Sequence, residues 1–164
     1  MTDLVNYAKL IPMKLSTKSE YGLRAMLNIA MNGSGGATSI ADISKKEGIS
    51  VAYLEQLLNK LRHEGLVESI RGPKGGYLLS KDTGSITVGD IVKTLEGPLY
   101  PVHCVAAQDG SRNVCKKSNG CVPKLVWLKL AKTIGDCLDS ITLAELCKEA
   151  KKIKGPRPLL GRIL

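Results

Sequence analysis

The chain has 164 residues, of which 43% are apolar and 24% are charged, a composition typical of globular proteins. No run of residues approaches the roughly 20 uncharged apolar residues of a membrane span. The first residues, MTDLVNYAKLIP, contain neither a basic leader nor a small-residue cleavage site. We therefore expect a cytoplasmic protein with no membrane contact.

The net charge is +9, from 24 Lys and Arg against 15 Asp and Glu. Such an excess favours a polyanionic partner, either nucleic acid or an anionic membrane face, although in many proteins it serves solubility alone. The chain has no Phe, one Trp and five Tyr, too few aromatic rings for a platform that stacks single-stranded bases. Double-stranded DNA is therefore the expected partner.

The first third of the chain is dense in helix start and stop signals. The sequence TKSE at 17–20 is a capping box that opens a first helix, which ends before the glycine-rich segment 32–36. Thr38 or Ser39 can begin a short second helix, and Gly48 ends it.

A third helix is expected to begin at Ser50 and to end at Gly65. Its apolar residues repeat at helical spacing and form one buried stripe, while the other face is polar. Two short helices joined by a tight glycine turn, the second with a polar exposed face, indicate a helix-turn-helix. The residues of the stripe are Val51, Leu54, Leu57, Leu58 and Leu61.

A basic hairpin follows this helix pair directly. Residues 66–70 and 77–79 are expected to form two strands, with RGPKGG at 71–76 as the turn between them. We therefore predict a winged helix-turn-helix domain over residues 13–97, preceded by an N-terminal extension at 1–12. The alternative is a structural hairpin packed on a helical pair, with a basic turn that is only solvated.

The exposed face of the third helix and the wing carry the candidate DNA contacts. Gln56 suits adenine and Glu55 can accept a hydrogen bond from cytosine N4, so both are candidate base readers near the helix N-terminus. Arg71 and Lys74 are expected to contact phosphate or to enter the minor groove, beside glycines that let the backbone approach closely. Each of these residues could also be plain surface. The full candidate set is Ser50, Tyr53, Glu55, Gln56, Arg62, Arg71, Lys74 and Gly75.

The second half of the chain is expected to hold a helix, a long loop and two further helices. Thr87 and Asp90 cap a helix that ends before residues 98–123, a polar loop that contains cysteines. Residues 124–150 contain two helices, and apolar residues cover most of the circumference of the first. So much apolar surface needs two partners, the winged domain and the same helix of a second subunit, which predicts a homodimer. The fold class is thus mainly α with a small β wing and a long C-terminal dimerisation helix, followed by a basic tail at 151–164.

Cys104, Cys115 and Cys121 form a C-x10-C-x5-C set in the loop. Three soft ligands favour an iron–sulfur cluster or zinc, and their polar neighbours argue against buried structural cysteines. Structural zinc sites usually pair their ligands as C-x2-4-C, and the sequence lacks such a pair, so zinc is the second choice. Three unrelated reduced thiols are the remaining alternative.

A cluster takes four protein ligands, so a fourth has to be found. His103 and Glu20 are candidates, and Glu20 could come from a partner subunit or could act only in the capping box. Cys137 and Cys147 lie beside apolar residues in the C-terminal helices, and we expect both to be ordinary buried thiols.

These residues resemble the family of winged-helix transcriptional regulators that includes IscR, NsrR and CymR. The resemblance covers about residues 13–147 and implies a DNA-binding homodimer with crossed C-terminal helices, in which an iron–sulfur cluster on the three cysteines tunes operator binding. It also implies DNA contacts from the helix that starts at Ser50 and from the turn 71–76. The matching stretches are LSTKSEYGLRAMLNIA, ADISKKEGISVAYLEQLLNKLRHEGLVES, IRGPKGGYLLSKD, ITVGDIVKTLEG, the three-cysteine loop and SITLAELC.

Two departures from the family pattern concern the cluster. IscR-like proteins have C-x5-C-x5-C followed by a His ligand, whereas the first gap here is ten residues and Lys124 stands in place of that His. In NsrR-like members a carboxylate from the first helix of the opposite subunit completes the cluster, and Glu20 falls at the matching position, which makes it a candidate fourth ligand. The family contains 2Fe-2S and 4Fe-4S members, of which we favour 2Fe-2S, while CymR-like relatives work without this cysteine set.

The sequence therefore predicts a homodimeric transcriptional regulator, not an enzyme, whose binding to a double-stranded operator is controlled by an iron–sulfur cluster. The signal would be cluster status, redox state or nitric oxide. The first alternative is a cluster-free or zinc-bound repressor that responds to a metabolite or a partner protein. The second is a small enzyme or electron carrier, which is disfavoured because the sequence has only two histidines and lacks a P-loop motif.

Overall fold

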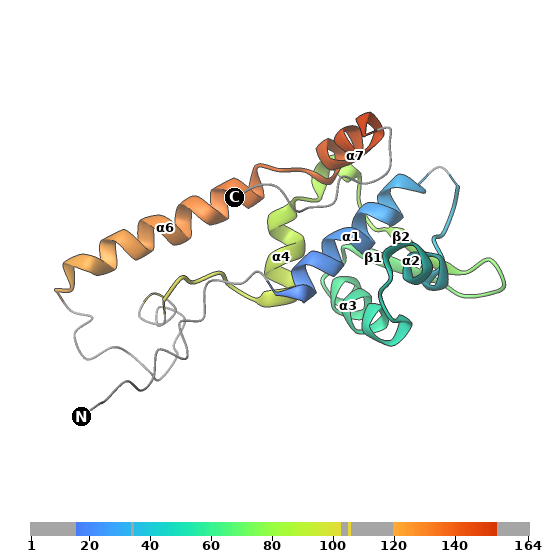
Figure 1. The fold of residues 1–164 in the computed structure, drawn as a ribbon, viewed down its shortest axis with the longest axis horizontal. Coiled ribbons are helices and arrows are strands. Elements are labelled where there is room, and N and C mark those ends of the chain that lie inside the picture. Colours follow the sequence, from blue (N-terminus) through green and yellow to red (C-terminus); the bar gives the residue numbers. More distant parts are fainter. Residues whose placement is uncertain (1–15, 34, 103–104, 106–119, 154–164) are drawn as a thin grey trace, which may run out of the picture.

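The computed structural model describes residues 16–33, 35–102, 105 and 120–153. Over these residues the chain is mainly helical, with one two-stranded sheet (Figure 1), as the sequence predicts. The helices are α1 (Thr17–Met31), α2 (Ile40–Glu47), α3 (Val51–His63), α4 (Val88–Glu96), α6 (Val122–Asp139) and α7 (Leu143–Lys152). The strands are β1 (Val67–Ile70) and β2 (Gly76–Leu79), and a short 3-10 turn covers Thr83–Ser85.

The start of α1 differs from the prediction. The N-cap is Ser16, whose side-chain oxygen accepts a hydrogen bond from the first turn at 3.2 Å. The predicted capping box of Thr17 and Glu20 is therefore wrong, and the Glu20 carboxylate instead pairs with Arg24 at 2.6 Å. The start of α1 is fixed by a long-range contact, in which the Ser16 backbone N–H donates to the Glu96 carboxylate at 3.1 Å. Residue spacing in the sequence does not reveal a contact of this kind.

The other helix starts follow the local sequence signals. Ser39 and Ser50 accept hydrogen bonds from the first turns of α2 and α3, and Gly48 ends α2 with φ +70°, a conformation that glycine adopts at little cost. The predicted caps of α4 and α7 are full capping boxes, formed by Thr87 and Thr142 with the carboxylates three residues later. Helix α6 begins at Val122, two residues before the predicted start, with a proline in its first turn.

The core lies between α1, α3 and α4 and extends under the wing. It includes the predicted stripe of α3 except Val51, the first helical residue, which is 38% exposed. Leu143 of α7 is fully buried, so the last helix also packs on this core. The fully buried large side chains are Met26, Ile29, Ile43, Leu54, Leu58, Leu61, Val67, Ile86, Ile91, Val105 and Leu143.

The two strands form an antiparallel wing directly after α3. Val67 pairs with Leu79 at its base and Ile70 with Gly76 at its tip. A separate bridge between Thr38 and Tyr77 links β2 to the segment before α2, through two backbone hydrogen bonds of 2.9 Å. The wing is therefore fixed to the helix-turn-helix at two places.

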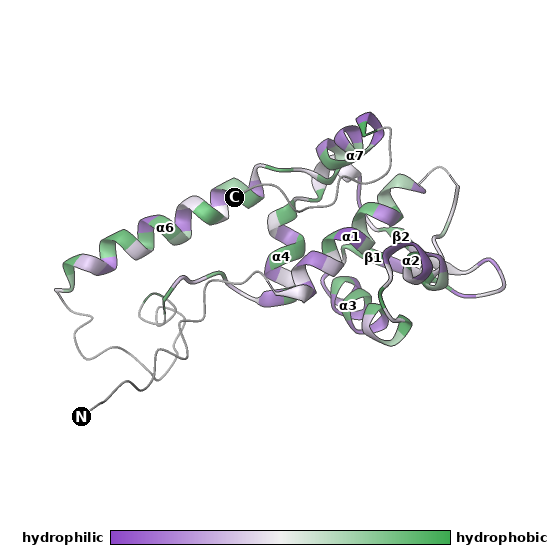
Figure 2. Cartoon of the chain, in the orientation of Figure 1, coloured by the Kyte–Doolittle hydropathy of each residue, from purple (hydrophilic) through white to green (hydrophobic). Residues whose placement is uncertain are grey.

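Helix α6 extends away from the winged domain, which it contacts through α4 near its own C-terminal end (Figure 1). None of its residues, all of which are described, is buried. One face, with Leu128, Ile134 and Leu138, is half-buried. Hydrophobic and hydrophilic residues alternate along the ribbon of α6 (Figure 2). A second set of apolar residues, which we call the outer stripe, is exposed to solvent. The outer stripe consists of Val122, Val126, Leu130 and Cys137.

The two cysteines of the C-terminal helices differ from each other. Cys147 on α7 is half-buried, and its burial raises the pKa of the thiol although Lys151 lowers it. Cys137 is exposed, so the prediction of a buried thiol is wrong at this position in the single chain. The reason is that Cys137 lies on the outer stripe, which no other part of the described chain covers.

Within the described ranges, no helix is both long and apolar enough to cross a bilayer.

Candidate DNA-binding surface and cysteine site

Helix α3, which carries most of the predicted DNA contacts and which we call the recognition helix, is oriented by its buried leucines. Leu54, Leu58 and Leu61 have no exposed surface, so they fix the helix on the core and turn its opposite face to solvent. The predicted contact residues Ser50, Glu55, Gln56 and Arg62 all lie exposed. Arg62 also donates a hydrogen bond to Asn59 at 2.8 Å, which orders its guanidinium on the helix surface.

Tyr53 lies differently from the other candidates on α3. It is half-buried, and its ring meets Tyr21 of α1 edge-on, with centroids 6.0 Å apart and an interplanar angle of 87°. Its hydroxyl is 3.5 Å from Thr17 Oγ1. Tyr53 therefore links the recognition helix to α1 and offers only part of its surface to a ligand.

The wing turn presents positive charge on a backbone that requires glycine. Arg71 and Lys74 are exposed. Gly72 has φ +119°, and a Cβ added to Gly75 would stand 2.4 Å from Ile70 O. The tight turn thus explains Gly75 by itself. Gly72, Gly75 and Gly76 also leave backbone without side chains next to Arg71 and Lys74, which phosphate can approach closely.

An ion-pair network centred on Arg24 connects α1 and α2. Arg24 lies 2.6 Å from Glu20 on its own helix and 3.8 Å from Glu47 at the end of α2, and its guanidinium is 6.0 Å from the centre of the Tyr21 ring. Asn28 also donates to Glu47 at 2.8 Å. This network was not among the predictions from the sequence, although the i,i+4 spacing of Glu20 and Arg24 is a signal that could have found their pair. Glu47 comes close to Arg24 only through the fold.

The cysteine loop lies mostly outside the described residues, including Cys104, Cys115 and the alternative ligand His103. Cys121 is a free, half-buried thiol at the N-cap of α6, where the helix dipole favours a negative group. Glu20 is exposed on α1, and the start of α6 lies well away from that helix (Figure 1). A site that uses both Glu20 and Cys121 would therefore draw them from two subunits. Among the described residues, no group of three or more metal-ligating side chains is present.

Comparison with known proteins identifies the family. A family model described as Rrf2, iron-dependent transcriptional regulator, matches residues 15–149. The chain belongs to the Rrf2 family. It is 40% identical over 134 residues to the HTH-type transcriptional regulator IscR of Klebsiella pneumoniae, a match that covers 82% of this chain and 79% of that protein. Rrf2 proteins are DNA-binding transcriptional regulators rather than enzymes, so the resemblance and the regulator class are confirmed.

Solved Rrf2 structures confirm the winged helix-turn-helix fold. CymR, the global cysteine regulator of B. subtilis, is 38% identical and superposes with a TM-score of 0.69, covering 83% of this chain and 97% of CymR. IscR of T. potens gives the same identity and TM-score, with coverage of 88% and 93%. The oxidised form of Staphylococcus aureus CymR is 34% identical, with a TM-score of 0.66 and coverage of 82% and 96%. The fold is thus equally close to IscR and to CymR.

Proposed function

We propose that this Rrf2 regulator is a homodimer whose operator binding is controlled by an iron–sulfur cluster. Cys104, Cys115 and Cys121 would hold the cluster, with Glu20 of the second subunit as the fourth ligand; 2Fe-2S is favoured and 4Fe-4S is possible. Such a cluster, when bound, supplies a centre sensitive to oxidation, to nitric oxide and to iron–sulfur supply. The observation that carries the proposal is the set of three cysteines in one polar segment of a chain whose family is described as iron-dependent.

The positions of the described ligands support a shared site. Cys121 is a free thiol at the start of α6. The Glu20 carboxylate is exposed, and within the described part of the chain it pairs with Arg24 alone. An exposed i,i+4 ion pair of this kind contributes little free energy, so Glu20 can exchange Arg24 for another partner at small cost.

The outer stripe of α6 supports the homodimer. Val122 and Val126 are 73% and 60% exposed, and Leu130 is 39% exposed. Monomeric proteins rarely leave a continuous apolar helix face in water. A second copy of the same helix offers a face of matching length and chemistry, as expected for a two-fold interface.

The cluster can be tested by anaerobic purification, followed by a visible spectrum and by iron, acid-labile sulfide and zinc assays on the same sample. We expect a coloured protein with equal iron and sulfide, and iron per subunit separates the two cluster types. Cys104→Ala should abolish the colour and leave a folded dimer, whereas the control Cys147→Ala, in α7, should keep it. Colourless protein that stays iron-free after reconstitution would exclude the cluster.

The DNA surface can be tested through the salt dependence of binding. Each phosphate contact contributes about 0.9 to the slope of log K against log salt concentration. Arg71→Ala should weaken binding and lower the slope by about that amount. Lys148→Ala, which removes an exposed charge from α7, is the matched control. An unchanged slope for Arg71→Ala would remove Arg71 from the contact surface.

A second candidate is a cluster-free repressor that responds to a metabolite or a partner protein. It is favoured by the equal structural similarity to CymR and by Lys124, which replaces a ligand of IscR-like proteins. Zinc on the three thiols is a further form of this candidate. The zinc assay on colourless protein separates a zinc site from bare thiols.

A further inference from the structure

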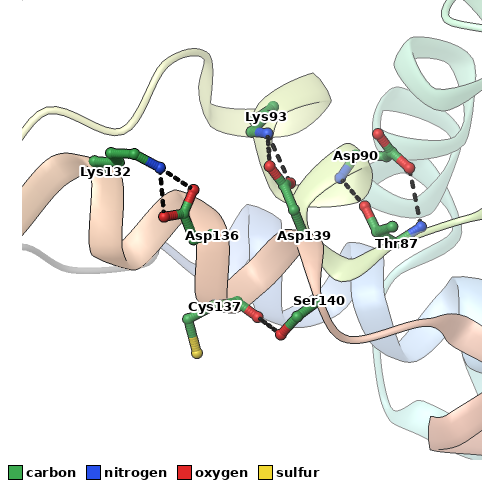
Figure 3. A network of polar contacts seen from close by, with 8 residues as sticks. All are labelled: Thr87, Asp90, Lys93, Lys132, Asp136, Cys137, Asp139 and Ser140. Carbon is green, nitrogen blue, oxygen red and sulfur yellow. Dashed lines mark hydrogen bonds and ion pairs between the residues drawn. The ribbon is translucent and has the colours of Figure 1, made fainter.

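The carboxylate of Asp139 occupies an unusual position at the end of α6. Asp139 is the last residue of that helix, where the helix dipole disfavours a negative charge. Lys93 of α4 binds both of its oxygens, at 2.7 and 2.6 Å (Figure 3). A Cβ built on Gly89 would stand 1.8 Å from Asp139 Oδ1 and 3.1 Å from its backbone nitrogen. Because Gly89 and Lys93 are four residues apart, the carboxylate lies against a single face of α4.

The chain that follows Asp139 is also fixed to α4. Two backbone hydrogen bonds of 2.8 Å form an antiparallel bridge between the segment after α6 and the segment that opens α4. The C-terminal end of α6 is thus held to α4 in two ways. The side chain of Asp139, before Ser140, binds Lys93, and the backbone at residues 141–143, after Ser140, bonds to the segment before α4. The bonds are Val88 N–H to Ile141 O and Leu143 N–H to Ile86 O, around the pair Thr87 and Thr142.

We propose that Asp139 is a positioning residue that, with Gly89 and Lys93, sets the angle between α6 and the winged domain. In the dimer that angle fixes the distance between the two recognition helices, and so the separation of the DNA half-sites that the protein selects. The inference rests on the proposed homodimer and on DNA binding through α3. It does not depend on the cluster.

Because α6 is long, a small change of angle at this junction produces a large displacement at the far end of the helix. Eighteen residues at about 1.5 Å each give a lever of about 27 Å, so a rotation of about 10° at one end moves the other by about 5 Å. That displacement exceeds the rise of about 3.4 Å per base pair of DNA. The Lys93 and Asp139 side chains are 47% and 45% exposed, so their ion pair adds little to folding stability. Its loss should therefore alter geometry more than it alters stability.

The experiment is selection from a library of random DNA duplexes, performed with the full-length wild type and with each variant. Asp139→Asn keeps the shape and removes the charge. Gly89→Ala disrupts the contact between α4 and Asp139 by adding a methyl group on α4. Because alanine has a higher helix propensity than glycine, this variant remains informative if Asp139→Asn folds poorly. Asp136→Asn is the matched control, because Asp136 pairs at 2.7 Å with Lys132 of the same helix and lies outside the junction (Figure 3).

We expect the wild type and Asp136→Asn to select two inverted half-sites at one separation. Asp139→Asn and Gly89→Ala should select the same half-site sequence with a separation that is broadened or shifted by about one base pair, and their Kd for the best wild-type duplex should rise about tenfold. A role in stability alone would weaken binding without changing the separation.

Two outcomes would overturn the inference, and they differ in what they say about the proposed function. Dimeric variants that select the wild-type separation, whether their Kd is unchanged or raised, would remove the positioning role of Asp139 and leave the dimeric regulator intact. A wild type that selects isolated half-sites and sediments as a monomer would overturn both this role and the proposed dimer.

Discussion

Helices α3 and α6 are both apolar along much of their length. In the described part of the chain α3 buries its leucines completely, whereas α6 buries its apolar side chains only in part. Leu54, Leu58 and Leu61 of α3 have no exposed surface, whereas Val126 and Leu130 of α6 are 60% and 39% exposed. The winged domain therefore completes its own core. Helix α6 has an outer stripe that no other part of the described chain covers.

This difference separates two properties that one sequence encodes. Packing around α3 should determine whether the winged domain folds, because burial of apolar surface is the dominant stabilising contribution to folding. The outer stripe of α6 should instead determine assembly, because its side chains gain little from folding of the single chain. Substitutions in the two helices are therefore expected to change different measured quantities.

The largest effect is expected in the core. Leu58→Ala removes a side chain without exposed surface from α3 and should lower the free energy of unfolding by about 2–5 kcal/mol, through lost burial and a cavity. Urea unfolding followed by circular dichroism measures the change. A loss below about 1 kcal/mol would mean that α3 is not the centre of the core.

The next largest effect is expected in assembly. Leu130→Asp places a carboxylate on the outer stripe and should raise the dimer dissociation constant at least about 100-fold, because the interface would bury an unpaired charge. Lys132→Asp introduces the same group on the polar face of α6 and is the control. Sedimentation equilibrium measures both. Equal dissociation constants for the two variants would mean that the outer stripe is not the interface.

The two helices also differ in how far their environments could be predicted from the sequence. The helix-turn-helix rests on local signals, and those of α2 and α3 are in place: serine caps at Ser39 and Ser50, a glycine stop at Gly48, and leucines at helical spacing on α3. Such signals act within a few residues, so they can be read without the fold. The candidate DNA residues on α3 are predictable for the same reason, because the buried stripe determines the exposed face.

Two of the failed predictions depend on parts of the molecule that are distant along the chain. The capping box at Thr17 fails because Glu96, 80 residues from Ser16, fixes Ser16 as the N-cap. Cys137 is exposed because no other part of the described chain covers the outer stripe of α6. The junction of Asp139 with Lys93 was likewise invisible, since spacing along the chain carries no information on pairing across 46 residues.

A smaller effect is expected at Glu96, which holds the start of α1 within the winged domain. Burial by itself raises the pKa of the Glu96 carboxyl, but hydrogen bonds from Ser16 and Ser19 outweigh it and hold the pKa below the ordinary value of 4.5. Glu96→Gln should lower the free energy of unfolding at neutral pH by about 1 kcal/mol, because a charge-assisted hydrogen bond is lost. Thermal unfolding at several pH values measures this.

The sign of the pH dependence follows from the lowered pKa. The unfolded chain binds a proton near pH 4.5 and the folded chain only at lower pH, so the contribution of Glu96 is complete above that value and is lost as pH falls through the folded pKa. The difference between wild type and Glu96→Gln should therefore shrink in acid. A difference that stays constant from neutral pH into acid would show that the carboxylate charge plays no part in holding α1.

The smallest effect is expected on the polar face of α6. Asp136 pairs with Lys132 at 2.7 Å, but the two side chains are 63% and 75% exposed, so water screens their attraction. Asp136→Asn should change the free energy of unfolding by less than about 0.5 kcal/mol and should leave the dimer dissociation constant unchanged. Urea unfolding and sedimentation equilibrium measure both quantities. A clear loss of the dimer in this variant would show that the interface extends beyond the outer stripe to the polar face of α6. Assembly would then depend on both of these faces of α6, while folding of the winged domain would still depend on α3.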